Sequence, residues 1–140
     1  WFCLVGSEMC IRDRVVAVPD EWIDVQTLAD LEEISFDFKD NKKSRLRVAT
    51  KYPNLTKEFL FSKGVTQFKL VPSLGATEVY PFTGSSEILT DITSTGETLK
   101  ANNLRILKDG NILKSTAILM SNKKSSNKIG LKKILNLLSS

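Results

Sequence analysis

The chain has 140 residues, of which 41% are hydrophobic and 26% charged, and its formal net charge is +4. This length and composition are typical of one globular domain, and no apolar run approaches the about 20 residues of a membrane span. The positive charge argues weakly for nucleic acid, because five lysines and no acid lie between Ser121 and Ser140, which leaves −1 on the rest. No aromatic side chains are interleaved with the basic ones, so neither nucleic acid nor a membrane is expected as a partner.

The first fourteen residues, WFCLVGSEMCIRDR, show no clear hydrophobic period and resemble translated sequencing-adapter sequence. We expect residues 1–14 to be a non-native scar and set them aside from the prediction of the fold. Both cysteines, Cys3 and Cys10, lie within this segment and the chain has no histidine, so we predict no metal or redox site from them. Nothing resembles a complete signal peptide, and the expected location is therefore the cytoplasm.

From Val15 onward, short apolar strands alternate with segments of helical period. Such alternation predicts an α/β domain with a mostly parallel sheet and flanking helices. Ligands of these sheets bind at the carboxyl ends of the strands, where the loops 50–54, 73–78 and 93–98 are expected. The predicted elements, in chain order, are a strand at 15–18; a helix with Asp24 as N-cap that carries Val25, Leu28, Leu31 and Ile34; a strand at 45–50; a helix with Leu55, Phe59 and Leu60 that Gly64 ends; strands at 65–71 and around 88–92; a helix at 97–103; strands at 104–107 and 111–120 joined by a hairpin turn at Asp109-Gly110; and an amphipathic C-terminal helix.

The segment EILTDITSTGETL, residues 87–99, is the most typical of a binding site. A β-prone run ends at Asp91, a loop of small residues follows, and a helix opens at Glu97. The first N–H groups of a helix have no intrahelical partner and favour an anion, and Gly96 lacks the Cβ that would hold a phosphate away from the backbone. Asp91 is placed to accept hydrogen bonds from sugar hydroxyls, so the segment predicts a pocket for a ribose 5-phosphate. The same pattern also fits a plain turn in which Ser94 or Thr95 caps the helix and nothing binds.

The motif D-I-T-S-T-G-E-T-L resembles the phosphoribosyl-pyrophosphate loop of phosphoribosyltransferases. With VAVPDEWIDVQTLADL, RLRVATKYPNLTKEF and LGATEVYPFTGSSEIL, the chain from Val15 to Asn122 resembles the catalytic subunit of ATP phosphoribosyltransferase, in its short alphaproteobacterial form. The resemblance implies the second lobe of a fold like that of type II periplasmic binding proteins. Residues 15–107 would form the lobe that binds phosphoribosyl pyrophosphate, and 108–140 a return strand and a C-terminal helix of a first lobe that is mostly missing from this N-terminally truncated fragment.

The resemblance also implies a reaction, in which ATP and phosphoribosyl pyrophosphate give phosphoribosyl-ATP and pyrophosphate, the first step of histidine biosynthesis. It implies Mg2+ held mainly by the substrate, and it assigns no residue to catalysis. Thr90 and Phe82 stand where smaller or apolar residues are usual in the family. The residues implied to bind phosphoribosyl pyrophosphate are Ser94, Thr95, Gly96, Glu97 and Thr98 for the 5-phosphate and Asp91 for the ribose, with weaker candidates in Glu87 for the sugar, Gly75, Ala76, Thr77 and Glu78 near the pyrophosphate or its magnesium, and Lys51 and Tyr52.

For the parent protein, the resemblance implies a homo-oligomer with a regulatory subunit related to histidyl-tRNA synthetase, and we expect this fragment alone to be inactive. One alternative is a non-catalytic anion- or solute-binding lobe of a protein like the periplasmic binding proteins, which would need an export signal. Another is a different phosphoribosyltransferase, such as a purine salvage enzyme. That group usually has two adjacent acids before its loop, whereas here Thr90 precedes Asp91.

Overall fold

The computed structural model describes residues 2–5, 12–115, 118–121 and 133, and it divides into two units. The smaller unit comprises the two ends of the chain, where β1 (Phe2–Val5) pairs antiparallel with β7 (Ile118–Ser121). The predicted C-terminal helix lies outside the described residues, apart from Lys133. Within the described residues, no helix is both long and apolar enough to cross a membrane.

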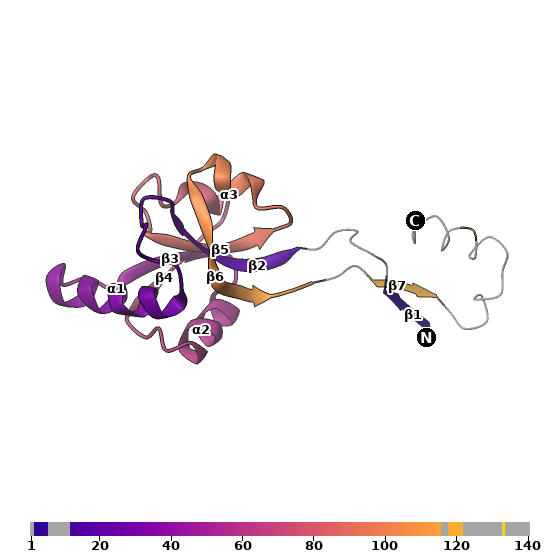
Figure 1. Cartoon of the computed structure of the whole chain (residues 1–140), viewed down its shortest axis with the longest axis horizontal. Coiled ribbons are helices and arrows are strands. Elements are labelled where there is room, and N and C mark those ends of the chain that lie inside the picture. The colour runs from indigo at the N-terminus through magenta and orange to yellow at the C-terminus, as the bar shows by residue number, and fades with distance from the viewer. Residues whose placement is uncertain (1, 6–11, 116–117, 122–132, 134–140) are drawn as a thin grey trace. The chain divides into compact units, whose positions relative to one another are not determined.

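The larger unit, Asp13–Leu113, is built on a five-stranded sheet with the strand order β4-β3-β5-β2-β6 (Figure 1). Its strands are β2 (Asp13–Pro19), β3 (Leu46–Thr50), β4 (Phe68–Pro72), β5 (Ile88–Thr93) and β6 (Leu104–Leu113). The expected α/β class is confirmed: four of the five strands share one direction, and β2 runs against them, which makes the sheet mixed. Strand β3 runs parallel to β4 and β5, whereas β2 runs antiparallel to both β5 and β6. The hydrophobic pattern of a strand indicates its burial and not its direction, so the sequence alone did not reveal a mixed sheet.

Helices cover both faces of this sheet. Helices α1 (Leu28–Asn41) and α2 (Pro53–Ser62) lie on one side and α3 (Glu97–Ala101) on the other (Figure 1). Because side chains alternate along a strand, β2 contributes to both cores. Val16 and Val18 pack in the cluster that contains the leucines of α1 and α2, and Val15 and Ala17 pack with Leu99 of α3.

Helix α1 begins at Leu28, and its N-cap is Thr27 rather than the predicted Asp24. The Oγ1 atom of Thr27 accepts a hydrogen bond from the N–H of Asp30 at 3.3 Å. In return, the Asp30 carboxylate accepts from the N–H groups of Gln26 and Thr27, at 2.9 and 2.8 Å. These bonds form a capping box, which satisfies N–H groups that the helix itself leaves without partners. Val25 is buried as expected, but it lies before the helix.

Residues Leu104–Leu113 form one strand, so the predicted hairpin at Asp109-Gly110 is wrong. Ala17 of β2 pairs with Ile106, and Val15 pairs with Asn111. Between these two pairs, β2 has the single residue Val16 and β6 has residues 107–110, so β6 forms a β-bulge here. A Cβ atom on Gly110 would lie 2.9 Å from the Cβ of Leu107, so only glycine allows this close approach.

The bulge holds the start of α1 against the sheet. Asp109 Oδ1 accepts a hydrogen bond from the N–H of Leu28 at 2.9 Å, and the N–H of Lys108 donates to the carbonyl of Gln26 at 3.0 Å. The Asp-Gly pair that resembles a hairpin signal therefore marks a contact between β6 and α1.

Other element boundaries differ from the predictions by a few residues. Strand β2 begins at Asp13 and so includes the last two residues of the segment expected to be non-native. Gly64 follows the last turn of α2 with φ of +88°, as expected for a residue that ends a helix. The predicted helix at 97–103 ends at Ala101.

Candidate functional site

Three loops converge at one edge of the sheet, because β3, β4 and β5 are parallel and end there together. Residue Lys51 follows β3, the segment 73–76 follows β4, and the segment 94–96 follows β5. The first two are joined by the N–H of Ser73, which donates to the carbonyl of Thr50 at 2.9 Å. This is the edge at which α/β sheets usually bind ligands.

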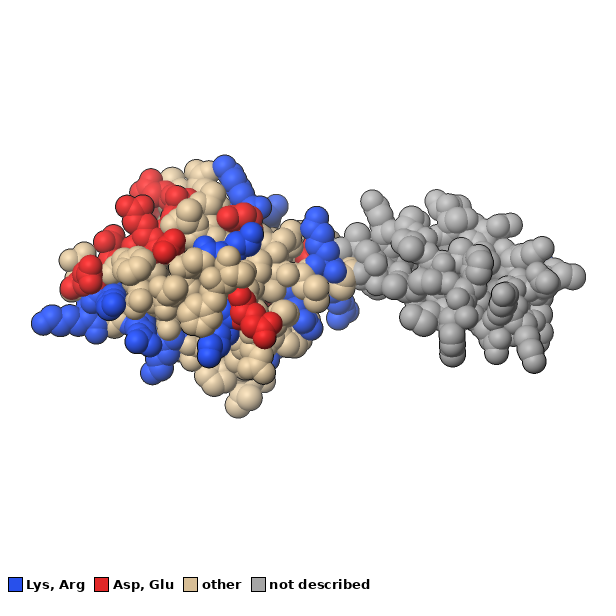
Figure 2. All heavy atoms as spheres, turned by 90° about the horizontal axis from the view of Figure 1, so that it is seen from below, with Lys and Arg blue, Asp and Glu red and all other residues tan. Residues whose placement is uncertain are grey.

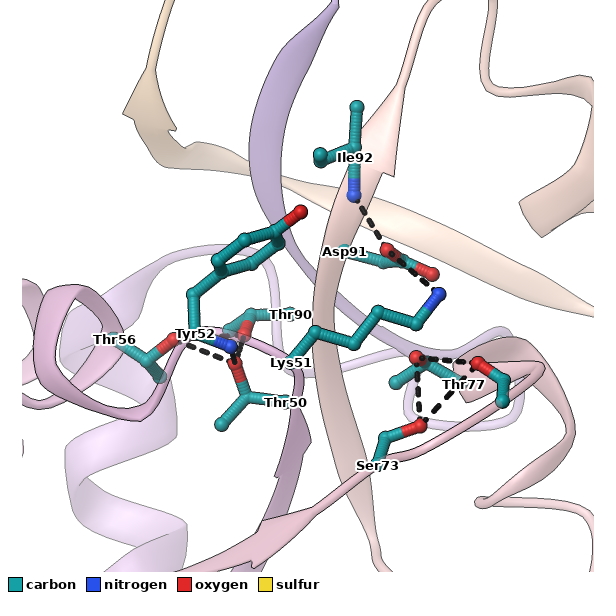
Figure 3. A network of polar contacts seen from close by, with 10 residues as sticks. Thr50, Lys51, Tyr52, Thr56, Ser73, Thr77, Thr90, Asp91 and Ile92 are labelled. Carbon is teal, nitrogen blue, oxygen red and sulfur yellow. Dashed lines mark hydrogen bonds and ion pairs between the residues drawn. The ribbon is translucent and has the colours of Figure 1, made fainter.

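Asp91 lies at this edge next to Lys51 (Figure 3). The distance from Lys51 Nζ to Asp91 Oδ1 is 3.9 Å, and the same oxygen accepts a hydrogen bond from the N–H of Ile92 at 2.7 Å. The Asp91 side chain is only 14% exposed, whereas that of Lys51 is 38% exposed. An ionised carboxylate has about four acceptor positions, so Asp91 retains capacity for the hydroxyl groups of a ligand.

The loop after Asp91 turns at Gly96, whose φ of +76° lies in the left-handed region. The N–H of Gly96 donates to Thr93 Oγ1 at 2.8 Å, while Gly96 itself is the N-cap of α3 and supplies no capping side chain. The alternative to a binding loop was a plain turn in which the side chain of Ser94 or Thr95 caps the helix. In the structure, Thr95 Oγ1 accepts only a long hydrogen bond of 3.4 Å, from the N–H of Glu97. Five residues are predicted to bind the phosphate. Gly96 is buried, and the other four are exposed: Ser94, Thr95, Glu97 and Thr98.

The loop after β4 is stabilised internally. Ser73 Oγ and Thr77 Oγ1 lie 2.9 Å apart (Figure 3). Each of these oxygens also lies 3.5 Å from the carbonyl oxygen of Gly75. Thr77 is buried at the start of the short 3-10 helix η1 (Thr77–Val79), whereas Gly75 and Ala76 are exposed and Glu78 is half-buried. Thr77 therefore shapes the loop, and its exposed neighbours are the groups that a ligand can reach.

Tyr52, the other weaker candidate on the loop after β3, is the N-cap of α2. Its N–H donates to Thr50 Oγ1 at 2.9 Å, and its ring lies 4.1 Å from the guanidinium carbon of Arg14. The backbone of Tyr52 thus contributes to the structure of the loop, and its ring is already in contact with a cation.

Glu87 does not join this site. It precedes β5 at the opposite end from Asp91, and four residues of strand correspond to about 13 Å. Its carboxylate accepts hydrogen bonds from the backbone N–H and from Nη2 of Arg47, both at 2.6 Å. The hydrogen bond to Glu87 raises the pKa of Arg47 above its ordinary value. The carboxylate of Glu87 therefore holds β3 and β5 together, and its role as a weaker candidate for the sugar stays a prediction.

A cavity of about 480 Å3 lies at this opposite end of the parallel strands. Trp22 and Phe38 line it together with the ion pair of Arg47 and Glu87. The cavity does not contain any of the residues predicted to hold the phosphate or the ribose, other than Glu87. The cavity and the three converging loops thus lie at opposite ends of the parallel strands.

Charges of both signs occupy the face shown in Figure 2, where lysine and arginine side chains lie beside aspartate and glutamate side chains. Among the residues coloured there, this face has no continuous basic surface of the kind that binds nucleic acid. Within the described part of the chain, no three His, Cys, Asp or Glu residues gather closely enough to hold a metal ion by themselves.

Comparison with known protein families assigns residues 9–140 to the model described as "HisG: ATP phosphoribosyltransferase". The chain belongs to this family. An ATP phosphoribosyltransferase of Chelativorans sp. (strain BNC1) is 53% identical over 113 residues, which make up 80% of this chain and 49% of that protein. The chain thus spans about half the length of the curated relatives that it matches.

Solved structures agree with this assignment. An ATP phosphoribosyltransferase (HisG:HisZ) complex from Thermotoga maritima matches 98% of this chain and 58% of the solved chain, with a TM-score of 0.58 and 28% identity. A periplasmic transporter matches with a TM-score of 0.53 over 99% of this chain and 45% of its own, at 15% identity, which shows a shared fold alone. The family match favours a phosphoribosyltransferase over the alternative of a solute-binding lobe.

Proposed function

We propose that this member of the ATP phosphoribosyltransferase family is the half of the enzyme that binds phosphoribosyl pyrophosphate. The whole enzyme would join ATP to phosphoribosyl pyrophosphate, giving phosphoribosyl-ATP and pyrophosphate in the first step of histidine biosynthesis. One observation carries the proposal: Asp91 lies 3.9 Å from Lys51 directly before the loop 94–98, at the edge where three loops converge.

The loop 94–98 would bind the 5-phosphate through backbone N–H groups and hydroxyls. Helix α3 has only five residues, so its dipole contributes little, and the local donors matter more. Ser94, Thr95 and Thr98 supply hydroxyl donors on an exposed surface. Gly96 adopts φ of +76° without a Cβ, which allows a phosphate oxygen to approach the backbone.

Asp91 would accept hydrogen bonds from the ribose hydroxyls, and Lys51 would face negative charge on the substrate. The exposed residues Gly75 and Ala76, with Glu78, would lie near the pyrophosphate or its magnesium. We leave Glu87 out of the proposed site, because Arg47 already occupies its carboxylate at the other end of β5.

The proposed reaction needs no general base, because adenine N1 attacks the sugar with an existing lone pair. A chain without histidine can therefore contribute to it, since positioning and electrostatic stabilisation supply most of the rate. Mg2+, held mainly by phosphate oxygens, would supply charge that stabilises the leaving pyrophosphate. Such ions usually take only one or two protein carboxylates, and Glu78, on the loop after β4, is the candidate here.

We also propose that the parent protein is a homo-oligomer in the cytoplasm with a regulatory subunit related to histidyl-tRNA synthetase. Support for such a partner comes from the similar Thermotoga maritima structure, which is a HisG:HisZ complex. Because the chain corresponds to about half of its relatives, we expect it to bind substrate weakly and not to complete the reaction alone.

Calorimetric titration with phosphoribosyl pyrophosphate and Mg2+ tests this function. Gly96→Ala adds a Cβ within the loop where we place the phosphate, at an ordinary 3.7 Å from Ile106 Cδ1. Gly84→Ala is the control, since Gly84 has a similar φ of +72° and no atom within 4 Å of its added Cβ. Both substitutions strain a left-handed residue by about 1 kcal/mol. We expect Gly96→Ala to weaken binding at least about tenfold and Gly84→Ala to leave it unchanged. Equal affinities of the two variants would refute the assignment of the loop.

A further inference from the structure

Three threonine hydroxyls form a closed triangle beneath the proposed site (Figure 3). Thr50 Oγ1 lies 2.9 Å from Thr56 Oγ1, Thr56 Oγ1 lies 2.9 Å from Thr90 Oγ1, and Thr90 Oγ1 lies 2.7 Å from Thr50 Oγ1. The residues come from the end of β3, the first turns of α2 and the middle of β5, and none is more than 2% exposed. The triangle therefore joins three elements in a place that water does not reach.

The direction of the hydrogen bonds around the triangle follows from donor counting. Each hydroxyl has a single hydrogen, and Thr90 donates its hydrogen to Thr50. Thr50 must then donate to Thr56, and Thr56 to Thr90, for all three contacts to be hydrogen bonds. Every donor in the ring is used, and each bond polarises the next, which strengthens the ring as a unit.

The ring lies directly behind Lys51 and Asp91. Thr50 and Thr90 pair in register on the neighbouring strands β3 and β5. Because successive side chains along extended backbone point to opposite faces, the next residue after each threonine, Lys51 just past β3 and Asp91 within β5, projects from the opposite face. Those two side chains approach to 3.9 Å there.

A further hydrogen bond connects the ring to the loop. Thr50 Oγ1 also accepts from the N–H of Tyr52 at 2.9 Å, which fixes the backbone on the far side of Lys51. The ring thus joins the end of β3 to the middle of β5 at the point where the loop after β3 leaves the sheet.

We propose that Thr50, Thr56 and Thr90 are positioning residues, whose hydroxyl ring holds Lys51 and Asp91 at the spacing that the substrate needs. The identity of the substrate in this inference rests on the proposed function. The claim that the ring holds the spacing of Lys51 and Asp91 does not depend on it. The ring also gives a physical role to the hydroxyl of Thr90. An apolar side chain at this position would fill the same space, but only the hydrogen bond between Thr50 and Thr56 would remain.

The test compares Thr90→Val, which keeps the shape and removes the hydroxyl, with Thr90→Ser, which restores the hydroxyl, in the full chain. The first measurement uses no ligand. Hydrogen exchange at the Tyr52 amide should be roughly tenfold faster in Thr90→Val and near the unmodified rate in Thr90→Ser. The amide of Leu60, in the buried part of α2, serves as the reference for global unfolding.

The second measurement is the dissociation constant for phosphoribosyl pyrophosphate with Mg2+. We expect Thr90→Val to weaken binding about five- to tenfold and Thr90→Ser to remain within about twofold of the unmodified chain. If Thr90→Val alters only global stability, with affinity and relative Tyr52 exchange unchanged, the positioning role is refuted.

If the unmodified chain does not bind phosphoribosyl pyrophosphate, the proposed function fails. Exchange at the Tyr52 amide then tests the ring alone, because faster exchange in Thr90→Val than in Thr90→Ser supports it and equal exchange overturns it. Should Thr90→Val not fold, Thr56→Ser and Thr56→Ala provide the same comparison from α2. Equal Tyr52 exchange in those two variants would overturn the proposal.

Discussion

Two acidic residues near β5 show how strongly position decides a role. Glu87 and Asp91 lie four residues apart in one motif, and the family resemblance implied that Asp91 binds the ribose, with Glu87 as a weaker candidate for the same sugar. In the structure, Glu87 is held by Arg47 at one end of the strand, whereas Asp91 lies beside the exposed Lys51 at the other. The partner of Glu87 is 40 positions away along the chain, and no local pattern reveals it.

Replacement of Glu87 by glutamine distinguishes the two acids. Glu87→Gln removes a charge-assisted contact that is partly exposed to solvent, and we expect it to lower the free energy of unfolding by about 1 kcal/mol. Denaturant unfolding measures this loss. Affinity for phosphoribosyl pyrophosphate should remain unchanged, since the carboxylate lies at the other end of β5. A large loss of affinity without a loss of stability would restore the original prediction for Glu87.

At the scale of elements, the sequence predicted most strands and helices near their true positions but not the contacts that fix them. Hydrophobic periodicity identifies β2, α1, β3 and α2, because burial of one face produces it. The capping box at Thr27 and the bulge at Gly110 depend on hydrogen bonds and on steric fit. Asp109 provides the clearest case, since its carboxylate caps α1 across 81 positions of sequence.

The capping box should make stability depend on pH. Hydrogen bonds from the backbone of Gln26 and Thr27, and from the Thr27 side chain, lower the pKa of Asp30 below its ordinary 3.8. A lowered pKa in the folded state stabilises the fold above the unfolded value, and this contribution is lost as the pH falls through the folded value. Asp30→Asn should therefore be less stable than the unmodified chain at neutral pH, with the difference closing from about pH 5 downward.

Denaturant unfolding at a series of pH values measures that difference. Asp37→Asn is the matched control, because it removes the same charge from an exposed position of the same helix. The control should retain the pH dependence of the unmodified chain. A constant difference between Asp30→Asn and the unmodified chain over the whole pH range would contradict the role of the capping box.

At the scale of the whole molecule, family membership and α/β class were predictable, because motifs in a fixed order carry both. The convergence of three loops was also predictable, since parallel strands end at one edge. The threonine ring was not, because its members lie 6, 34 and 40 positions apart and each resembles an ordinary strand or helix residue. The chain spans about half the length of the curated relatives that it matches.

The central claim is that substrate binds at the carboxyl ends of β3, β4 and β5, and amide NMR during titration with phosphoribosyl pyrophosphate and Mg2+ tests it most directly. The structure offers two competing places, the Asp91 loop and the cavity at the opposite end near Arg47. We predict that the amide signals of Ser94–Thr98 and Lys51 shift on titration while those of Arg47 and Glu87 do not. Shifts confined to Arg47, Glu87 and the residues around Trp22 would contradict the account, because they would place the ligand in the cavity instead.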